Sequence, residues 1–248
     1  MEGQKINIIN FYPLDQEISL FAPKPIPTKN FLPDWYKEMY SYANNDKHSF
    51  RGINGDINGG GHFQNATAKK CMSIFDTLVS GYYLLCPVDI FFDSTEENVI
   101  YRWRNNKHNF IMTHDSEQLA TYPRDDNYVK EALRWIPSHM IETPPGYSIL
   151  ITHPHHGQDL PFYTLPGIID SDRMLAAGAL PFDLKKGYKG IIKKGTPIAQ
   201  VMPFKREDWD HQVFDYQPER FLKEANMLNS AFSNIYKDNY WERKSFKW

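Results

Sequence analysis

The sequence predicts a mainly β fold of the α+β class, and three features of the chain support this prediction. Phe, Trp and Tyr make up 15% of the 248 residues, and aromatic side chains are enriched in strands. Seventeen prolines against fourteen glycines indicate many short strands joined by turns, with few long helices. From Trp135 onward, short apolar runs such as Ser148–Thr152 recur between Gly and Pro residues.

The N-terminal third of the chain mixes extended segments with short helices. Lys5–Tyr12 carries the β-branched and aromatic bias of a strand. The prolines of residues 13–33 predict an extended stretch that contains no helix. A short helix is expected over Asp34–Tyr42, and a second over Ala68–Ser80, where the side chain of Thr67 can cap the first turn.

The rest of the chain is predicted as strands followed by one helix. Asn105-Asn106 lies between two strand-like runs and predicts a β-hairpin. From Pro218 to about Tyr240, apolar residues recur at the spacing of an amphipathic helix. We therefore expect one β-rich domain over residues 1–217, with a proline-rich extended segment at its start, and an appended helix and basic aromatic tail over residues 218–248. The expected strands are Tyr82–Val88, Asp89–Phe92, Val99–Trp103, Asn109–Thr113, Ser148–Thr152, Gly167–Asp170, Tyr188–Ile192 and Ile198–Phe204.

Composition and charge argue against several classes of function. The formal net charge is −2, so no overall field draws the chain to duplex nucleic acid or to anionic membranes. No apolar run approaches the roughly 20 residues that span a bilayer, and the start of the chain does not resemble a signal peptide. Cys71 and Cys86 each lie among apolar neighbours, where a free thiol behaves as a small buried hydrophobe. We expect a soluble protein of a reducing compartment.

A cluster of polar residues directly after the strand Ser148–Thr152 is the first candidate site. His153 and His155 would share a face if the strand continued, and Asp159 could complete a first-row metal site for Fe, Mn or Zn. This spacing resembles the first motif of the cupin family. The histidine of the second cupin motif has no counterpart between Asp170 and Asp210, which favours the alternative of a polar loop whose histidines are solvated or hydrogen-bonded to backbone.

A second candidate site comes from the runs PGIIDSD (166–172) and KKGTPIAQV (193–201). Together these runs resemble the central motifs of the dUTPase and dCTP deaminase superfamily. The resemblance implies a β-clip-like barrel, for which a jelly-roll-like barrel is the alternative, and trimeric assembly. It also implies that Asp170 positions water or ribose. Asp172 and Arg173 follow in the same turn and are further candidate ligand-binding residues.

The parts that such a hydrolase needs are largely replaced in this chain. Arg173-Met174 stands where the family has an aromatic residue that stacks on uracil, and residues 153–157 stand where it has a phosphate-binding Pro-Arg-Ser segment. The glycine-rich C-terminal arm is replaced by the predicted helix. Without the phosphate cradle the charge of the transition state is not stabilised, so we do not expect dUTP hydrolysis.

A resemblance over most of the chain is to uncharacterised proteins of tailed phages, and more distantly to a bacterial family of unknown function. It is carried by the segments KKCMSIFDTLVSGYYLLCPVDI, TPPGYSILITHP, DLPFYTLPGIIDSD and GIIKKGTPIAQVMPFKRE. This resemblance implies a phage origin, with expression in the host cytoplasm or association with the virion.

Three hypotheses follow. The first is a non-catalytic binding or assembly protein, a homo-oligomer and by the β-clip resemblance a trimer, whose small-molecule or protein ligand the sequence does not identify. The second is a cupin-like metal-dependent enzyme that uses the cluster around His153. The third is a nucleotide-binding relative of the dUTPases in which Asp170 contacts the ligand. Bound metal would distinguish the second hypothesis, and a nucleotide titration followed by tryptophan fluorescence would distinguish the third.

Overall fold

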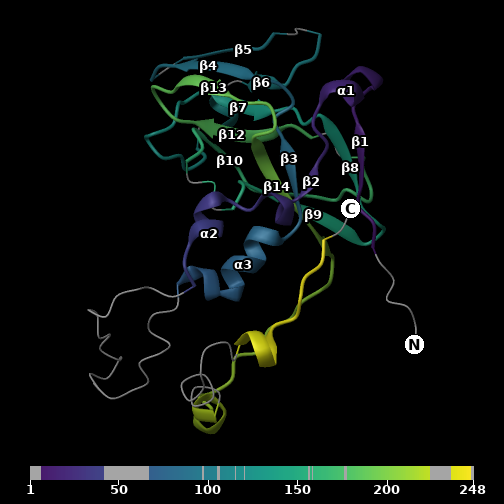
Figure 1. Cartoon of the computed structure of the whole chain (residues 1–248), viewed down its shortest axis with the longest axis vertical. Helices are drawn as coiled ribbons and strands as arrows, with labels where there is room; N and C mark the ends of the chain where they lie inside the picture. Colours follow the sequence, from purple (N-terminus) through teal and green to yellow (C-terminus); the bar gives the residue numbers. More distant parts are fainter. Residues whose placement is uncertain are drawn as a thin grey trace. The chain divides into compact units, whose positions relative to one another are not determined.

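The computed structural model describes residues 7–41, 67–96, 98–104, 107–114, 116–119, 121–155, 157, 159–175, 178–223 and 236–246 (Figure 1). The described residues fall into two units, one from residues 7–28 and 81–207 and the other from residues 29–80 and 208–246. The predicted boundary between residues 217 and 218 stays a prediction. Among the described residues, no helix is long and apolar enough to cross a membrane.

The expected mainly β fold with a few short helices is confirmed, and the strand pairs of the described residues are all antiparallel. The strands are β1 (Asn10–Pro13), β2 (Ile26–Pro27), β3 (Tyr82–Leu85), β4 (Ile90–Ser94), β5 (Val99–Arg102), β6 (Ile111–His114), β7 (Ala132–Trp135), β8 (His139–Glu142), β9 (Tyr147–Thr152), β10 (Phe162–Thr164), β11 (Gly167–Ile169), β12 (Leu180–Leu184), β13 (Lys189–Ile192) and β14 (Pro197–Lys205). The helices are α1 (Gln16–Phe21), α2 (Asp34–Glu38) and α3 (Met72–Val79), with the 3-10 helices η1 (Thr28–Phe31), η3 (Ala68–Lys70) and η4 (Ser116–Leu119) and the π-helix η5 (Tyr236–Tyr240).

Four sheets make up the first unit. The largest has the strand order β11-β9-β14-β3-β2, and the others have the orders β10-β12-β7-β6, β13-β4-β5 and β1-β8. Buried residues alternate with partly buried ones along β4, and partly buried residues alternate with exposed ones along β5, so one face of each strand is turned to the core. The barrel closure implied by the β-clip resemblance stays a prediction.

Trp135, which is 1% exposed, lies at the centre of the core of the first unit. Its ring stacks on Phe182 at 4.0 Å between centroids and meets Phe162 edge-on at 5.0 Å. Its indole N–H donates to Thr164 Oγ1 at 3.2 Å, and that hydroxyl in turn donates to the carbonyl of Ile198. These contacts satisfy the buried polar atoms and join strands of two sheets, because Thr164 lies in β10 and Ile198 in β14.

The second unit contains α2 and α3, and the tail of the chain contacts α3. The rings of Tyr36 in α2 and Phe75 in α3 are stacked at 6.3 Å between centroids. Trp241 donates its indole N–H to the carboxylate of Asp76 in α3, and Lys244 lies 2.9 Å from the same carboxylate. Of the predicted C-terminal helix, residues 218–223 are helical, whereas residues 224–235 lie outside the described residues.

Three sequence-based expectations were wrong. The stretch of residues 13–33 contains α1, because Asp15 caps it by accepting a hydrogen bond from the backbone N–H of Ile18 at 2.8 Å, and six residues fit between Pro13 and Pro23. The strands on either side of Asn105-Asn106 do not form a hairpin, since β5 pairs with β4 and β6 pairs with β7. Cys86 is buried as expected, but Cys71 is exposed at the start of α3.

Candidate functional site

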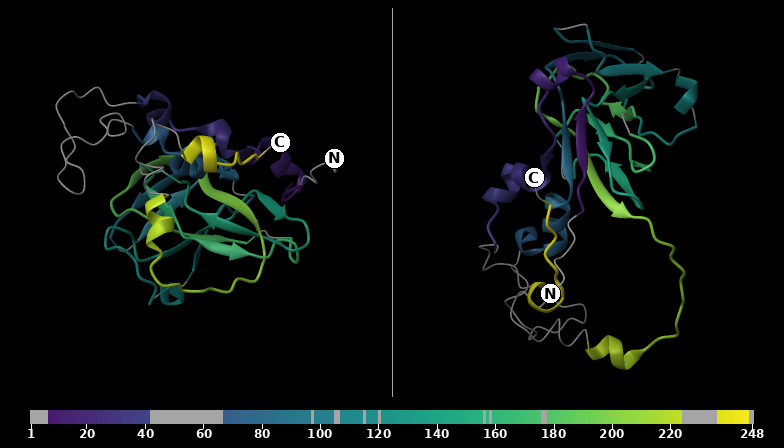
Figure 2. Two further views of the ribbon diagram at one scale, coloured as in Figure 1. Left: turned by 90° about the horizontal axis from the view of Figure 1, so that it is seen from below. Right: turned by 90° about the vertical axis from the view of Figure 1, so that its right-hand side faces the viewer.

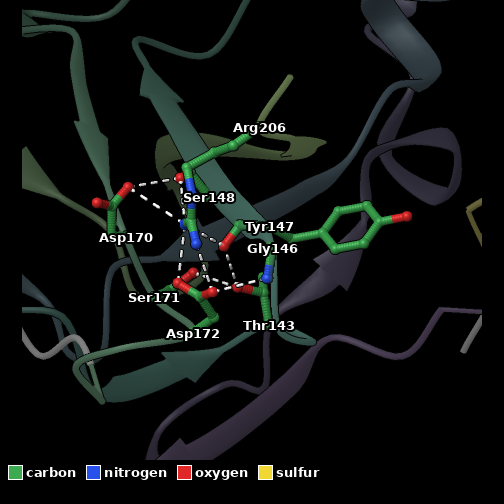
Figure 3. A network of polar contacts seen from close by, with 8 residues as sticks. All are labelled: Thr143, Gly146, Tyr147, Ser148, Asp170, Ser171, Asp172 and Arg206. Carbon is green, nitrogen blue, oxygen red and sulfur yellow. Dashed lines mark hydrogen bonds and ion pairs between the residues drawn. The ribbon is translucent and has the colours of Figure 1, made fainter. Parts of the chain in front are cut away.

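The predicted ligand-binding residues lie in a tight turn at one corner of the five-stranded sheet. β11 ends at Ile169, and the carbonyl of Asp170 then accepts the backbone N–H of Arg173 at 3.0 Å. The neighbouring strand β9 is entered through Gly146, whose φ of +85° favours glycine. At the end of β14, the backbone N–H of Arg206 donates to the carbonyl of Gly146 at 2.8 Å. Three strand ends therefore meet at this turn (Figure 3).

Asp172 is clamped by Arg206 at this corner. The two terminal nitrogens of the guanidinium donate to the two carboxylate oxygens at 2.8 and 2.5 Å, and the backbone N–H of Gly146 donates to Oδ2 at 2.8 Å. The hydrogen bond from Arg206 is the main reason that the pKa of Asp172 lies well below its usual range. The Asp172 side chain is only 6% exposed, so it is an internal anion rather than a free ligand for a solute.

Asp170 lies at the outer side of the same network. Ser148 donates its hydroxyl to Asp170 Oδ1 at 2.6 Å, and the same hydroxyl accepts a hydrogen bond from Arg206 at 2.9 Å. The Asp170 side chain is 49% exposed, and its Oδ1 lies 3.4 Å from the guanidinium. Arg173 is exposed and joins the turn through its backbone. The structure thus brings Asp170 and Asp172 together around Arg206, with Asp170 as the solvent-facing member.

Sequence reasoning missed the buried partners of this network. Thr143 donates to the carbonyl of Tyr147 at 3.0 Å, and its hydroxyl lies 2.7 Å from that of Ser171. Thr143 and Ser171 are both nearly fully buried, and Arg206 also donates to the carbonyl of Tyr147 at 3.0 Å. The only signal in the sequence was the TPPGY segment itself, because the contacts of Arg206 reach across 34 residues to Asp172.

The network can hold the corner of the sheet together, but most of its polar groups are bonded to one another rather than available to a substrate. The terminal nitrogens of Arg206 are directed to Asp172, Ser148 and a backbone carbonyl, so the guanidinium is engaged inside the protein. Arginine's planar fork is well suited to such a fixed, multiply bonded position. We therefore read these residues as a structural clamp with one exposed carboxylate.

His153 follows β9 and is held by two hydrogen bonds. The backbone N–H of Thr164 donates to Nδ1 at 3.2 Å, which makes Nδ1 an acceptor, and Nε2 lies 3.1 Å from the carbonyl of Gly157 and donates to it. The ring packs at 5.7 Å from that of Phe162 and at 4.9 Å from that of Tyr163. Burial is the main cause that lowers the pKa of His153, so the neutral imidazole with a proton on Nε2 is favoured.

The metal site predicted from His153, His155 and Asp159 stays a prediction, and at His153 both ring nitrogens are engaged with backbone groups. The backbone N–H of His155 donates to Gln200 Oε1 at 3.0 Å, a contact that does not involve its imidazole, and Asp159 is exposed. Among the residues that the structure describes, no group of three His, Cys, Asp or Glu side chains could hold a metal ion. His156, the other histidine of the cluster, lies outside them. The contacts of His153 match the alternative of a loop histidine bonded to backbone.

The longest exposed segment among the described residues follows directly after this corner. Every residue of 207–223, hereafter the arm, is exposed, and residues 206–217 have no regular secondary structure. Six large apolar side chains of the arm are more than half exposed: Trp209 (86%), Val213 (91%), Phe214 (70%), Tyr216 (75%), Phe221 (61%) and Leu222 (53%). Clustered exposed apolar side chains of this kind mark surfaces that bind other molecules.

No family model matches the chain, and a search of curated proteins finds no significant match.

Proposed function

We propose that this protein is a non-catalytic binding or assembly protein, encoded by a phage and acting in the infected cell or as part of the virion. The observation that carries the proposal is the arm, which exposes six large apolar side chains along seventeen consecutive residues. Water does not stabilise such a segment, and its burial against a partner would remove that apolar surface from solvent. The phage origin rests on the resemblance in sequence.

The candidate polar sites support the non-catalytic part of the proposal. A general base or nucleophile needs a titratable group that faces a substrate and is free to exchange a proton. Asp172 is bonded to Arg206 and Gly146, and His153 uses both nitrogens on backbone groups. Asp170 is the exposed member of the corner, and the cation beside it, Arg206, is bonded to Asp172, Ser148 and a backbone carbonyl rather than directed to a phosphate, as phosphoryl transfer would require.

The test is a turnover assay on the full chain with dUTP and dCTP in the presence of Mg²⁺, with Asp170→Ala as the matched variant. We expect no release of pyrophosphate or phosphate above the level of Asp170→Ala. Turnover that is lost in Asp170→Ala would contradict the proposal and return the protein to the nucleotide hydrolases. Titration of the same nucleotides against tryptophan fluorescence should give no saturable response.

A further inference from the structure

The three-stranded sheet β13-β4-β5 has an outer face that combines apolar and cationic side chains. The register pairs Ile191 with Phe91 and Phe91 with Arg102, and it pairs Lys189 with Asp93 and Asp93 with Ile100. Paired residues lie on the same face of a sheet, so these six side chains share one face. The opposite face carries Ile90, Phe92 and Ile192, which are all buried in the core.

Two isoleucines on the outer face are exposed in spite of their size. Ile100 is 63% exposed and Ile191 is 46% exposed. On the same face, the guanidinium of Arg102 lies 4.7 Å from the ring centroid of Phe91, a cation–π arrangement that keeps the cation above an apolar surface. The face therefore offers apolar contact and positive charge in the same place.

The edge of this sheet is strongly basic. The run of residues 185–194, which includes β13, contains five lysines and no acidic residue. Two carboxylates of β4 and the turn before it offset part of this charge, since Lys189 lies 2.6 Å from Asp93 and Lys193 lies 3.4 Å from Asp89. A partner for this surface should carry apolar side chains interleaved with acidic ones.

The arm has that composition. Residues 207–223 contain five acidic residues and two basic ones, a net charge of −3, and the acids are interspersed among the six exposed apolar side chains. The complement to the outer face of β13-β4-β5 is thus encoded in the same chain. Each buried aromatic side chain removes about 150–250 Å² from water. The four aromatics of one arm could bury about 600–1,000 Å², similar to the roughly 800 Å² per partner of a stable interface.

The path of the chain favours a second copy as the partner. The arm begins directly after β14, and Figure 1 and the right-hand view of Figure 2 place the end of β14 at the opposite end of the first unit from β4, β5 and β13. The first residue of the arm, Glu207, therefore follows a strand end that lies on the side of the first unit away from the basic face. To reach the basic face of its own copy, the arm would have to run back along the first unit. A neighbouring copy can present its basic face directly to the arm.

We infer that the arm of one copy binds the outer face of the β13-β4-β5 sheet of a second copy. This inference rests on the proposed function and names the partner as the chain itself. Apolar side chains such as Phe214 and Tyr216 contact Ile100, Ile191 and Phe91, and the acids of the arm face Arg102 and the lysines of residues 185–194. The contact joins two different surfaces, so it builds either closed rings or longer assemblies.

Sedimentation velocity of the full chain over a concentration series tests the inference. We expect Ile100→Glu to weaken self-association about tenfold or more, because it places an acid against an acidic arm and removes an apolar contact. Ile168→Glu is the matched control, because Ile168 is 64% exposed and also lies in an edge strand, but in β11 of another sheet. The double variant Phe214→Ser/Tyr216→Ser should weaken association as Ile100→Glu does.

A complementation measurement separates loss of the contact from loss of folding. A fluorescent peptide of residues 207–223 should bind the wild-type chain and the Phe214→Ser/Tyr216→Ser chain, whose basic face is intact, but not Ile100→Glu. Mixing the two variants should restore association, since one supplies the arm and the other the face. A monomer at every concentration, or association that Ile100→Glu leaves unchanged, overturns the inference. Either result leaves the proposed function standing, because that proposal is tested separately and only turnover of a nucleotide in that assay would contradict it.

Discussion

Replacing His153 by alanine should destabilise the fold, because both ring nitrogens are hydrogen-bonded to backbone groups and the ring packs against two aromatic side chains. The change leaves the backbone N–H of Thr164, a fully buried residue, without its acceptor, which costs about 1–3 kcal/mol. Loss of the ring contacts with Phe162 and Tyr163 adds about 0.5–1.5 kcal/mol. We therefore expect a loss of about 2–4 kcal/mol in the free energy of unfolding.

Urea denaturation followed by tryptophan fluorescence measures this loss, and thermal unfolding should show a midpoint lower by about 5–15 °C. His211→Ala is the matched control, because the His211 side chain is 91% exposed and its removal should change stability by less than about 0.5 kcal/mol. His153→Phe should recover part of the loss by restoring ring packing. Equal midpoints for His153→Ala and His211→Ala would refute the structural role of His153.

Three further predictions concern the clamp, the buried histidines and one glycine. Asp172→Asn should lower the urea midpoint at pH 7, whereas Asp34→Asn, at a carboxylate that is 82% exposed, should not. Because Arg206 holds the pKa of Asp172 well below its usual range, the gap in midpoint between Asp172→Asn and wild type should narrow as the pH falls below about 4. Burial lowers the pKa of His153 and of His139, so below about pH 6.5 the unfolded chain binds more protons than the folded chain and the free energy of unfolding should fall, less steeply in His153→Phe. An unfolding midpoint that rises as the pH drops below about 6.5 would contradict this prediction. Gly81→Ala should lower the free energy of unfolding by about 1–3 kcal/mol more than Gly187→Ala, because both glycines have positive φ but only at Gly81 would a Cβ lie 2.1 Å from the carbonyl oxygen of Val201. Equal unfolding midpoints for the two variants would show that the strand can shift to make room.

Local patterns in the sequence were enough to place many of the elements. Ser148–Thr152 was predicted as a strand and lies within β9, because its apolar run is bounded by a Pro-Pro-Gly turn. The helix expected over Ala68–Ser80 corresponds to η3 and α3, and Thr67 does cap the first turn by accepting the backbone N–H of Lys69. Such features depend on residues close together in the chain, which a single sequence contains.

Pairing between distant segments could not be predicted in the same way. The residues around Asn105-Asn106 suit a hairpin locally, but β5 pairs with β4 and β6 pairs with β7, and these partners lie in other segments of the chain. The candidate site shows the same limit. Asp170 and Asp172 were found through a motif, whereas Arg206, which holds both, became visible only when the ends of β9, β11 and β14 were seen together.

The metal content of the protein, purified without a histidine tag, tests most directly whether the polar clusters serve structure rather than chemistry. Elemental mass spectrometry per mole of chain should find no Fe, Mn or Zn above the level found in the His153→Ala variant, because the Nδ1 and Nε2 atoms of His153 are bonded to backbone groups of Thr164 and Gly157. One mole of a first-row metal per mole of wild-type chain, lost in His153→Ala, would contradict a binding or assembly role and identify the cluster as a metal centre.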